Sequence, residues 1–257
     1  MQNTLVYRVN FLFRATFGLV PLMATIFLWR AVYGGIAEGG EVVGYTLAQM
    51  TSYYLIVTLV DMLTAVADDD WQIAADIREG TISQFLLKPI NYLGYRLCLF
   101  FSGRIIYTAV ALVPVGIFLW AMRSYLVLPP DWMTFGVFCF SVALTGLLQF
   151  LISFTMAMLA FWVLEVSTFI FLLFALEYLA GGHLFPLDIL PAALVRVLEF
   201  TPFPYQLYFP VSIYLGRTTD TALWEGLAIQ TLWVLVGLVA ARLTWQRGIR
   251  KYAAFGG

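Results

Sequence analysis

Charged side chains are scarce in this sequence. Lys, Arg, Asp and Glu make up 11% of the 257 residues, whereas hydrophobic residues make up 62% and aromatic residues 17%. A soluble globular domain carries about 25% charged residues, which cover its surface in water. With a net charge of −1, the chain also has no overall field that would attract a nucleic acid. This composition excludes a soluble enzyme, a disordered protein and a nucleic-acid-binding protein, and it indicates an integral membrane protein with little mass outside the bilayer.

Reactive and metal-binding side chains are also few. The sequence has two cysteines, two lysines and one histidine, His183. A multi-histidine zinc site and a disulfide framework are therefore excluded. Neither Lys88 nor Lys251 lies in a phosphate-binding loop, and the H-E-x-x-H and G-x-S-x-G motifs are missing. We expect no metal site, no catalytic site and no nucleotide-binding site in this chain.

Long uncharged segments alternate with charged ones along the chain. A membrane-spanning helix needs about 20 mainly apolar residues. On this basis we predict six spans, at residues 15–33, 45–66, 103–122, 133–162, 165–184 and 222–244. No internal repeat and no low-complexity linker divides the sequence, so we expect a single domain over residues 1–257.

The distribution of positive charge predicts the orientation of the spans. Six spans place both termini on the same side. If that side is the cytoplasm, ten positive residues lie inside: Arg8, Arg14, Arg78, Lys88, Arg96, Arg104, Arg242, Arg247, Arg250 and Lys251. Only four lie outside: Arg30, Arg123, Arg196 and Arg217. Cytoplasmic loops carry the excess of Lys and Arg, so we predict that both termini are cytoplasmic.

The charged loop between spans two and three contains the pattern of a short helix. Asp68, Asp69 and Asp70 precede Trp71 and an apolar run, and carboxylates stabilise the first turn of a helix. Gly80 is a typical helix stop. A helix of about two to three turns is marginal by itself in water, so we expect another surface to pack against it.

The first residues of the chain allow two interpretations. Leu5, Val9, Leu12 and Phe13 share one face of a helix, which is typical of an amphipathic helix in the inner membrane interface. The alternative is that residues 1–14 simply extend the first span.

The segment at residues 181–217 is apolar but cannot form one regular spanning helix. It contains five prolines and begins with Gly181 and Gly182. Proline breaks a helix interior, so the segment predicts short helices that dip into the outer leaflet, one of them near residues 190–200. Irregular backbone at that depth is tolerated only where protein or a water-filled cavity covers it.

Three carboxylates lie at or within the predicted spans, where ionisable groups are costly and are candidates for function. Asp61, near the inner end of span two, either contributes to a pathway, reaches interfacial water or pairs with Arg14. Glu165 marks the inside turn between spans four and five. Glu177 lies deepest, and it either lines a pathway or is protonated and bonded to a neighbouring helix. We interpret His183 as a polar partner in the irregular segment after span five.

Three stretches of the sequence resemble the membrane subunit of type-2 ABC exporters, the ABC-2 permease family. They are IREGTISQFLLKPIN at residues 77–91, GGHLFPLDILPAAL at 181–194 and TPFPYQLYFPVSIYLG at 201–216. The order and placement of these stretches cover nearly the whole chain. The resemblance implies an all-α polytopic membrane protein with six transmembrane helices, an N-terminal interfacial helix, a cytoplasmic coupling helix and outer re-entrant short helices between spans five and six.

The resemblance also implies partners and a location. A permease of this family docks on a separate ABC ATP-binding subunit, present in two copies, which binds ATP and Mg and drives export. It pairs with a second permease, identical or a sister chain, in the bacterial cytoplasmic (inner) membrane. The coupling helix would run from about Asp69 to Gly80. The residues implied in coupling are Asp69, Asp70, Trp71, Ile73, Asp76, Ile77, Arg78, Glu79 and Gly80.

In the family the substrate passes between the two permeases along spans two and five. Here Glu177, Gln149 and Asp61 would be the rare polar groups of that path, and its apolar walls suit an amphipathic or hydrophobic substrate. The alternative is a proton-coupled secondary transporter or channel that uses Glu177 and Asp61. The lack of an inverted repeat argues against this alternative.

Overall fold

Helices make up nearly all the regular structure of the chain. The structure is a computed structural model that describes every residue except 1, 37–39, 67–68, 164 and 253–257, and every side chain of the described residues except those at 2–12, 14–15 and 69–70. Apart from one bridge between Val42 and Tyr45, this part of the chain contains only helices and loops. The elements are α1 (Gln2–Gly34), α2 (Leu47–Thr64), α3 (Asp69–Arg78), α4 (Ser83–Leu86), α5 (Tyr92–Ala121), η1 (Arg123–Tyr125), α6 (Trp132–Ala157), η2 (Met158–Phe161), α7 (Ser167–Ala180), η3 (Leu187–Ile189), α8 (Ala192–Leu198), η4 (Phe203–Gln206), α9 (Tyr208–Tyr214) and α10 (Asp220–Lys251).

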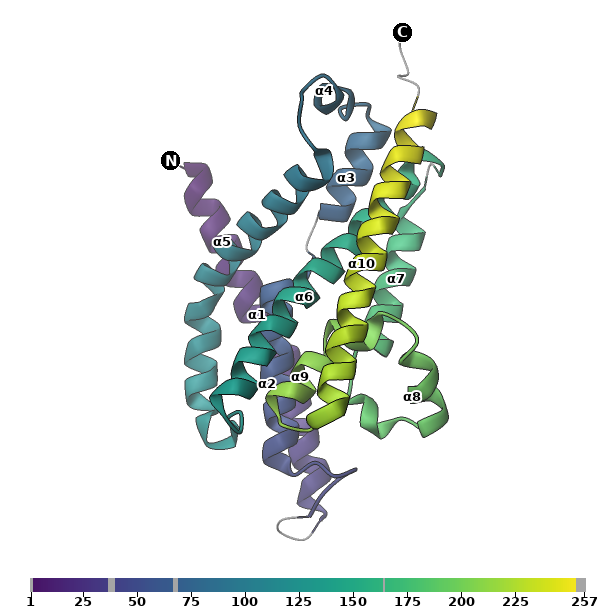
Figure 1. Ribbon diagram of the computed structural model, residues 1–257. Helices are drawn as coiled ribbons and strands as arrows, with labels where there is room; N and C mark the ends of the chain where they lie inside the picture. The colour runs from purple at the N-terminus through teal and green to yellow at the C-terminus, as the bar shows by residue number, and fades with distance from the viewer. Residues whose placement is uncertain (1, 37–39, 67–68, 164, 253–257) are drawn as a thin grey trace.

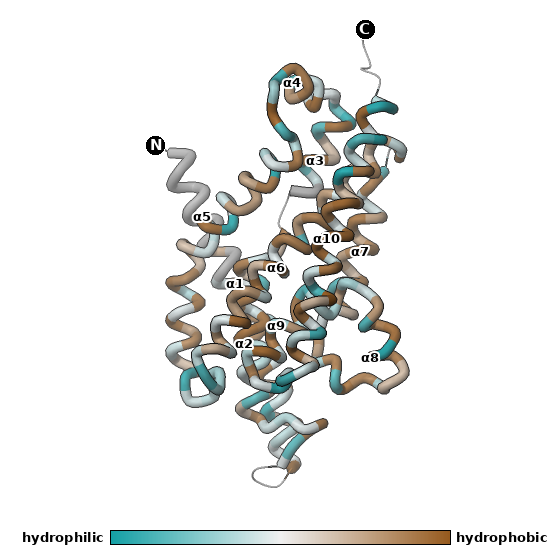
Figure 2. Tube along the Cα trace, in the orientation of Figure 1, coloured by the Kyte–Doolittle hydropathy of each residue, from teal (hydrophilic) through white to brown (hydrophobic). Residues whose placement is uncertain are grey.

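Four helical segments among the described residues are long and apolar enough to cross a membrane. They are Thr16–Gly34 within α1, Tyr92–Ala121, Trp132–Phe161 and Asp220–Lys251. Their positions correspond to predicted spans one, three, four and six. Figure 2 shows these long helices as mainly hydrophobic tubes. The multi-helix membrane architecture expected from composition is thereby supported.

The helix at the position of predicted span two, α2, is surrounded by protein. Eleven of its 18 residues are buried. The hydroxyl groups of Tyr53 and Tyr54 donate hydrogen bonds of 2.6 Å to the carbonyl oxygens of Gly182 and Leu184. A helix in the interior can carry polar side chains that find partners there, as Tyr53 and Tyr54 do.

The helix at the position of predicted span five, α7, is shorter than expected. The prediction of a helix over residues 165–184 is wrong at both ends, because α7 has 14 residues. At 1.5 Å per residue it is about 21 Å long, against about 30 Å for the hydrocarbon core. The chain turns at Gly182, whose φ of +94° favours glycine, and a Cβ there would lie 2.6 Å from the Tyr53 hydroxyl oxygen. Gly182 thus turns the chain directly against Tyr53 of α2, two residues after α7 ends.

The predicted start of span three is also wrong. We placed it at residue 103 because Arg96 and Arg104 interrupt the uncharged run, but α5 begins at Tyr92 with Asn91 as its N-cap. Arg96 is only 5% exposed, and its guanidinium pairs with the Asp76 carboxylate of α3. A paired charge can lie within a helix without ending it, whereas our criterion treated every charge as a boundary.

The N-terminal residues form no separate element. Helix α1 runs without a break from Gln2 to Gly34. This agrees with the alternative in which residues 1–14 extend the first span, and not with a distinct interfacial helix. At about 50 Å, α1 is longer than the hydrocarbon core is thick.

Short helices connect α7 to α10, as the prolines predict. The predicted helix near residues 190–200 is α8, which is mostly exposed, whereas six of the seven residues of α9 are buried against the core formed with α2 and α6. Figure 1 shows α8 at the side of the bundle. In the same view α1 begins and α10 ends at the end that carries α3 and α4, while α1 ends and α2 begins at the opposite end.

Candidate functional site

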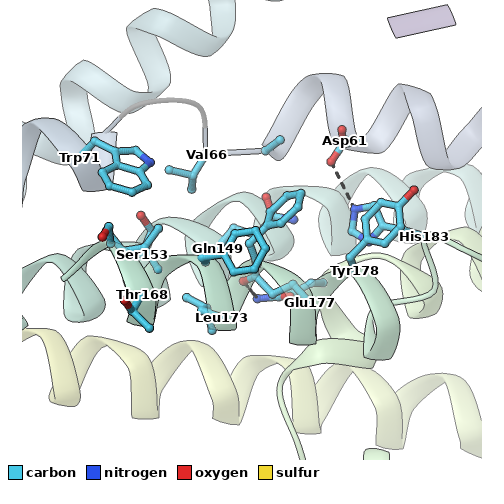
Figure 3. A pocket seen from close by; sticks show the side chains of 16 residues that line it. Asp61, Val66, Trp71, Gln149, Ser153, Thr168, Leu173, Glu177, Tyr178 and His183 are labelled. Carbon is cyan, nitrogen blue, oxygen red and sulfur yellow. Dashed lines mark hydrogen bonds and ion pairs between the residues drawn. The ribbon is translucent and has the colours of Figure 1, made fainter. Parts of the chain in front are cut away.

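A cavity of about 680 Å³ lies between α2, α6 and α7 (Figure 3). Its walls combine apolar and aromatic side chains with a few polar ones. The lining residues are Asp61, Ala65, Val66, Trp71, Gln149, Ser153, Ser167, Thr168, Ile170, Phe171, Leu173, Phe174, Glu177, Tyr178, His183 and Gln206. An apolar cavity with few, convergent polar groups is the usual form of a small-molecule site.

The three residues predicted to line a substrate path meet in this one cavity. Asp61 comes from α2, Gln149 from α6 and Glu177 from α7. The two elements at the positions of predicted spans two and five thus lie on either side of the same space.

Each carboxylate of the cavity has a polar neighbour. The Gln206 amide Nε2 donates to Glu177 Oε1 at 3.0 Å. His183 Nε2 lies 3.5 Å from Asp61 Oδ1, and the imidazole stacks on Tyr178 with ring centres 5.1 Å apart. His183 is therefore a polar partner, as its position after span five predicts. Asp61 lines the cavity with a side chain that is 46% exposed, and the side chain of Arg14, its alternative partner, lies outside the described residues.

Three polar atoms of the lining residues are buried without a hydrogen-bond partner in the described part of the chain. They are Gln149 Oε1, Ser153 Oγ and His183 Nδ1. A buried polar atom is costly unless it is hydrogen-bonded, so an unpaired one facing a cavity marks a place for a ligand atom or water.

A second, smaller cavity of about 210 Å³ lies between α1, α2 and α5. Asp61, Tyr178 and His183 line both cavities. These three side chains consequently lie between the two spaces.

The short helix expected at residues 69–80 is present as α3, Asp69–Arg78. Its buried face consists of Ile73, Ala74 and Ile77, which pack against α6 and η2. The expected packing surface for this marginal helix is thus supplied by the chain itself. As a result Ile73 and Ile77, two of the residues implied in coupling, are covered in the structure.

The other residues implied in coupling have several different positions. Trp71 is 43% exposed and lines the cavity, and Arg78 and Glu79 are exposed at the end of α3. Asp76 accepts hydrogen bonds from Arg96 and from the Tyr92 hydroxyl. The side chains of Asp69 and Asp70 lie outside the described residues.

Gly80 ends α3 in the left-handed conformation, with φ +78°. Its carbonyl oxygen accepts a hydrogen bond of 3.2 Å from the Tyr252 hydroxyl, which follows α10. Gly80 therefore contributes to the turn after α3 and to its attachment to the end of α10.

Sequence reasoning missed an exposed apolar surface beside α3. Leu87 is 88% exposed, and Leu86 and Ile90 are 42% and 43% exposed, in the turn around α4. In the sequence, this surface was indicated only by a pair of adjacent leucines before Lys88 and Pro89, outside every predicted span. This apolar turn and the exposed end of α3 lie at the same end of the molecule (Figure 1).

Ser153, His183 and Gln206 were also absent from the predicted pathway. Ser153 and Gln206 give a weak signal in the sequence because each is a common polar residue in or beside an apolar segment, whereas His183 is the single histidine and was interpreted as a polar partner only. Only the early end of α7 brings His183 next to α2, and only the fold of η4 brings Gln206 next to Glu177. The predicted position of Glu165 in a turn is confirmed, since it precedes α7 and accepts the Ser167 N–H at 3.1 Å.

The described residues contain no cluster of three or more His, Cys, Asp or Glu that could hold a metal ion. The apolar helices indicate a multi-pass membrane protein, and they surround a partly polar cavity. The model of the ABC-2 family transporter proteins matches residues 19–256, and the chain belongs to this family. No curated protein and no solved structure matches this chain. Family membership identifies a membrane permease and implies association with an ABC ATP-binding subunit.

Proposed function

We propose that this protein is the membrane-spanning permease subunit of an ATP-driven ABC exporter. It moves an amphipathic or hydrophobic substrate out across the bacterial cytoplasmic membrane, and a separate ATPase subunit, present in two copies, binds ATP and Mg. A second permease, identical or a sister chain, completes the complex. Both termini, α3 and α4 face the cytoplasm, and α2 and α7 belong to a six-span domain.

One structural observation gives the main support for this proposal. Trp71 of α3 and the pathway residues of α2, α6 and α7 line the same cavity. A short helix that packs on the permease core and reaches into the cavity is suited to transmit movement from a docked ATPase to the substrate path. A two-state element that contacts both sites is the physical requirement for such coupling.

The docking surface is formed by the exposed parts of this end of the molecule. Arg78 and Glu79 lie at the end of α3, and Leu87 is the most exposed residue of the apolar turn around α4. An apolar patch surrounded by charge is typical of a protein interface. Ile73 and Ile77 act differently, since they anchor α3 to the permease itself.

The test is purification of the tagged protein in mild detergent, followed by mass spectrometry and an ATPase assay of the eluate. The variant Arg78→Glu reverses a charge on the docking surface, and Arg196→Glu makes the same reversal on exposed α8, away from α3. We expect a P-loop ATPase to co-purify with the wild type and with Arg196→Glu, and to be lost with Arg78→Glu. Equal retention by both variants would overturn the docking surface.

The proton-coupled alternative makes an opposite prediction. A lone chain that transports in vesicles in response to a proton gradient, and that ignores ATP, would replace the exporter proposal with a secondary transporter. Asp61 and Glu177, which line the cavity, would then be its candidate proton sites.

A further inference from the structure

The last turns of α10 carry an exposed basic face. Its members, all of them exposed, are Arg242, Arg247, Arg250 and Lys251. At 3.6 residues per turn these four residues lie within one half of the helix circumference. No Asp or Glu follows Glu225 in this helix, and the four basic residues form no ion pair with another described residue. Like charges four residues apart repel on a helix, so an anionic partner would stabilise this face.

The opposite side of the same helix end is packed against the rest of the protein. Gly248 faces Phe161 of η2 so closely that a Cβ on the glycine would lie 2.2 Å from the ring. Trp245 stacks on a tyrosine ring of α5 with ring centres 4.7 Å apart. The hydroxyl of Tyr252 donates to the Gly80 carbonyl oxygen after α3. The basic face therefore points away from α3, α5 and η2, and it is exposed in the described part of the chain.

The basic face continues an exposed apolar face of the same helix. On the same side of α10, the exposed apolar residues are Leu232, Leu235, Val236, Val239 and Leu243. Contacts between helices in a membrane favour small residues, which let the backbones approach, whereas large aliphatic side chains suit a surface covered by lipid. We therefore expect acyl chains to cover the apolar part of this face. The headgroups of the same lipids then lie next to the basic part.

The spacing along the helix axis agrees with this arrangement. Arg242 lies at the end of the apolar face, and Arg247 lies about 7.5 Å farther along the axis. The headgroup layer of one leaflet is about 5–8 Å thick. Long basic side chains can also extend toward phosphate groups while their stems stay on apolar surface. A cytoplasmic protein could cover the charges alone, but a lipid covers both the charges and the adjoining apolar residues.

We infer that the exposed face of α10 from Leu232 to Lys251 binds anionic phospholipids of the cytoplasmic leaflet. The acyl chains lie on its aliphatic residues, and the phosphate groups pair with its arginines and lysine. This inference goes beyond the proposed function and rests on it only for the orientation, which places the end of α10 at the cytoplasm. Zwitterionic lipids bind more weakly, because their own positive group offsets the charge of the phosphate.

Native mass spectrometry of the purified protein in a neutral detergent tests this inference by counting bound lipids. Phosphatidylglycerol, an anionic phospholipid, is titrated in one series, and phosphatidylcholine with the same acyl chains is titrated in a second series. We expect phosphatidylglycerol to bind about tenfold more tightly or better. Its affinity should fall as salt is added, because salt screens exposed charges. Equal affinity for the two lipids would overturn the inference.

Paired variants locate the lipid site. Arg247→Gln with Arg250→Gln removes two charges from the basic face, whereas Arg123→Gln with Arg196→Gln removes two exposed charges from η1 and α8. Each Lys or Arg near an anionic surface strengthens binding about fivefold, so the first pair should weaken phosphatidylglycerol binding about 25-fold. The second pair should leave the affinity unchanged. A loss of the same size in both pairs would overturn the assignment to α10, because binding would then follow net charge alone.

Folding and the exporter proposal are tested separately from lipid binding. Arg247→Lys with Arg250→Lys keeps both charges and should keep the lipid affinity, which distinguishes lost charge from a lost fold. If phosphatidylglycerol binds no better than phosphatidylcholine while a P-loop ATPase still co-purifies, the lipid face is wrong and the exporter stands. If phosphatidylglycerol binds but no ATPase co-purifies, the lipid face stands and the exporter does not. Loss of the ATPase from the glutamine pair on α10, with unchanged lipid affinity, would assign this face to the ATPase instead.

Discussion

Asp76 is the residue that fixes α3 to the start of α5. Its carboxylate pairs with Arg96 and accepts a hydrogen bond of 3.2 Å from the Tyr92 hydroxyl. Arg96 is only 5% exposed, so the pair is largely shielded from water at the arginine side. Removing one partner of a buried pair leaves the other charge without compensation, which costs about 3–5 kcal/mol. Asp76 is accordingly interpreted as a structural residue and not as a direct contact of the ATPase.

The substitution Asp76→Ala tests this role. We expect the free energy of unfolding to fall by about 3 kcal/mol, since Arg96 keeps its bond to Tyr92 but loses its counter-charge. Thermal unfolding of the purified protein in detergent measures the change. Glu79→Ala is the matched control, because Glu79 is exposed on the same segment and should shift stability by less than about 0.5 kcal/mol. Equal stability of the two variants would contradict the structural role of Asp76.

At the scale of elements, the early end of α7 creates the candidate site. Helix α7 stops at Ala180, and the residues that follow carry His183 to within 3.5 Å of Asp61. The glycines at 181–182 were visible in the sequence as a break. The sequence could not predict the contact between Tyr53 and Gly182, because that contact depends on how the loop after α7 packs against α2. Sequence patterns thus predicted the elements, while packing decided their ends.

A buried polar network joins α10 to α6. Gln230 is fully buried, and its Nε2 donates to the carbonyl oxygens of Tyr205 and Ser141 at 2.9 and 3.1 Å. Its Oε1 accepts from the Ser141 hydroxyl at 2.9 Å. Interhelical hydrogen bonds of this kind hold helices together where lipid gives no hydrophobic driving force.

The substitution Gln230→Leu should therefore weaken the fold. It removes the acceptor of the Ser141 hydroxyl and the shorter of the two hydrogen bonds to the Tyr205 carbonyl, which keeps only the Thr145 hydroxyl at 3.3 Å. An unsatisfied buried group costs about 1–3 kcal/mol. Gln246→Leu, at an exposed position of the same helix, is the control. The unfolding temperatures of both variants in one detergent give the comparison. A drop of similar size for Gln246→Leu would mean that the network adds nothing specific.

At the scale of the whole molecule, composition and the placement of motifs predicted the membrane class and the family. Asp61, Gln149 and Glu177 were also chosen from sequence, and they line one cavity. Polar residues in apolar helices are costly and are retained where helices face an interior space, which agrees with their shared position, and their role in transport stays a prediction. The position of Trp71 could not be predicted in this way, because it depends on the return of α3 onto α6 and η2.

Trp71 links the proposed ATPase-docking helix, α3, to the proposed substrate cavity. It belongs to α3 but lines the cavity, so its loss should affect communication more than docking. We expect Trp71→Ala to keep the P-loop ATPase in the eluate but to lower transport of substrate by the complex, and Trp71→Phe to restore at least part of the transport. Loss of the ATPase from the Trp71→Ala eluate would instead place Trp71 in the docking surface.

The most direct test of the central claim is the mass of the intact complex, measured by native mass spectrometry after purification in mild detergent. The account predicts two permease chains, either two copies of this 29.0 kDa chain or one copy with a sister chain, together with two copies of a P-loop ATPase. Addition of ATP and Mg should give hydrolysis by the same complex. A single chain, or a pair of permeases that carries no nucleotide-binding partner, would contradict the assignment as an ABC exporter subunit.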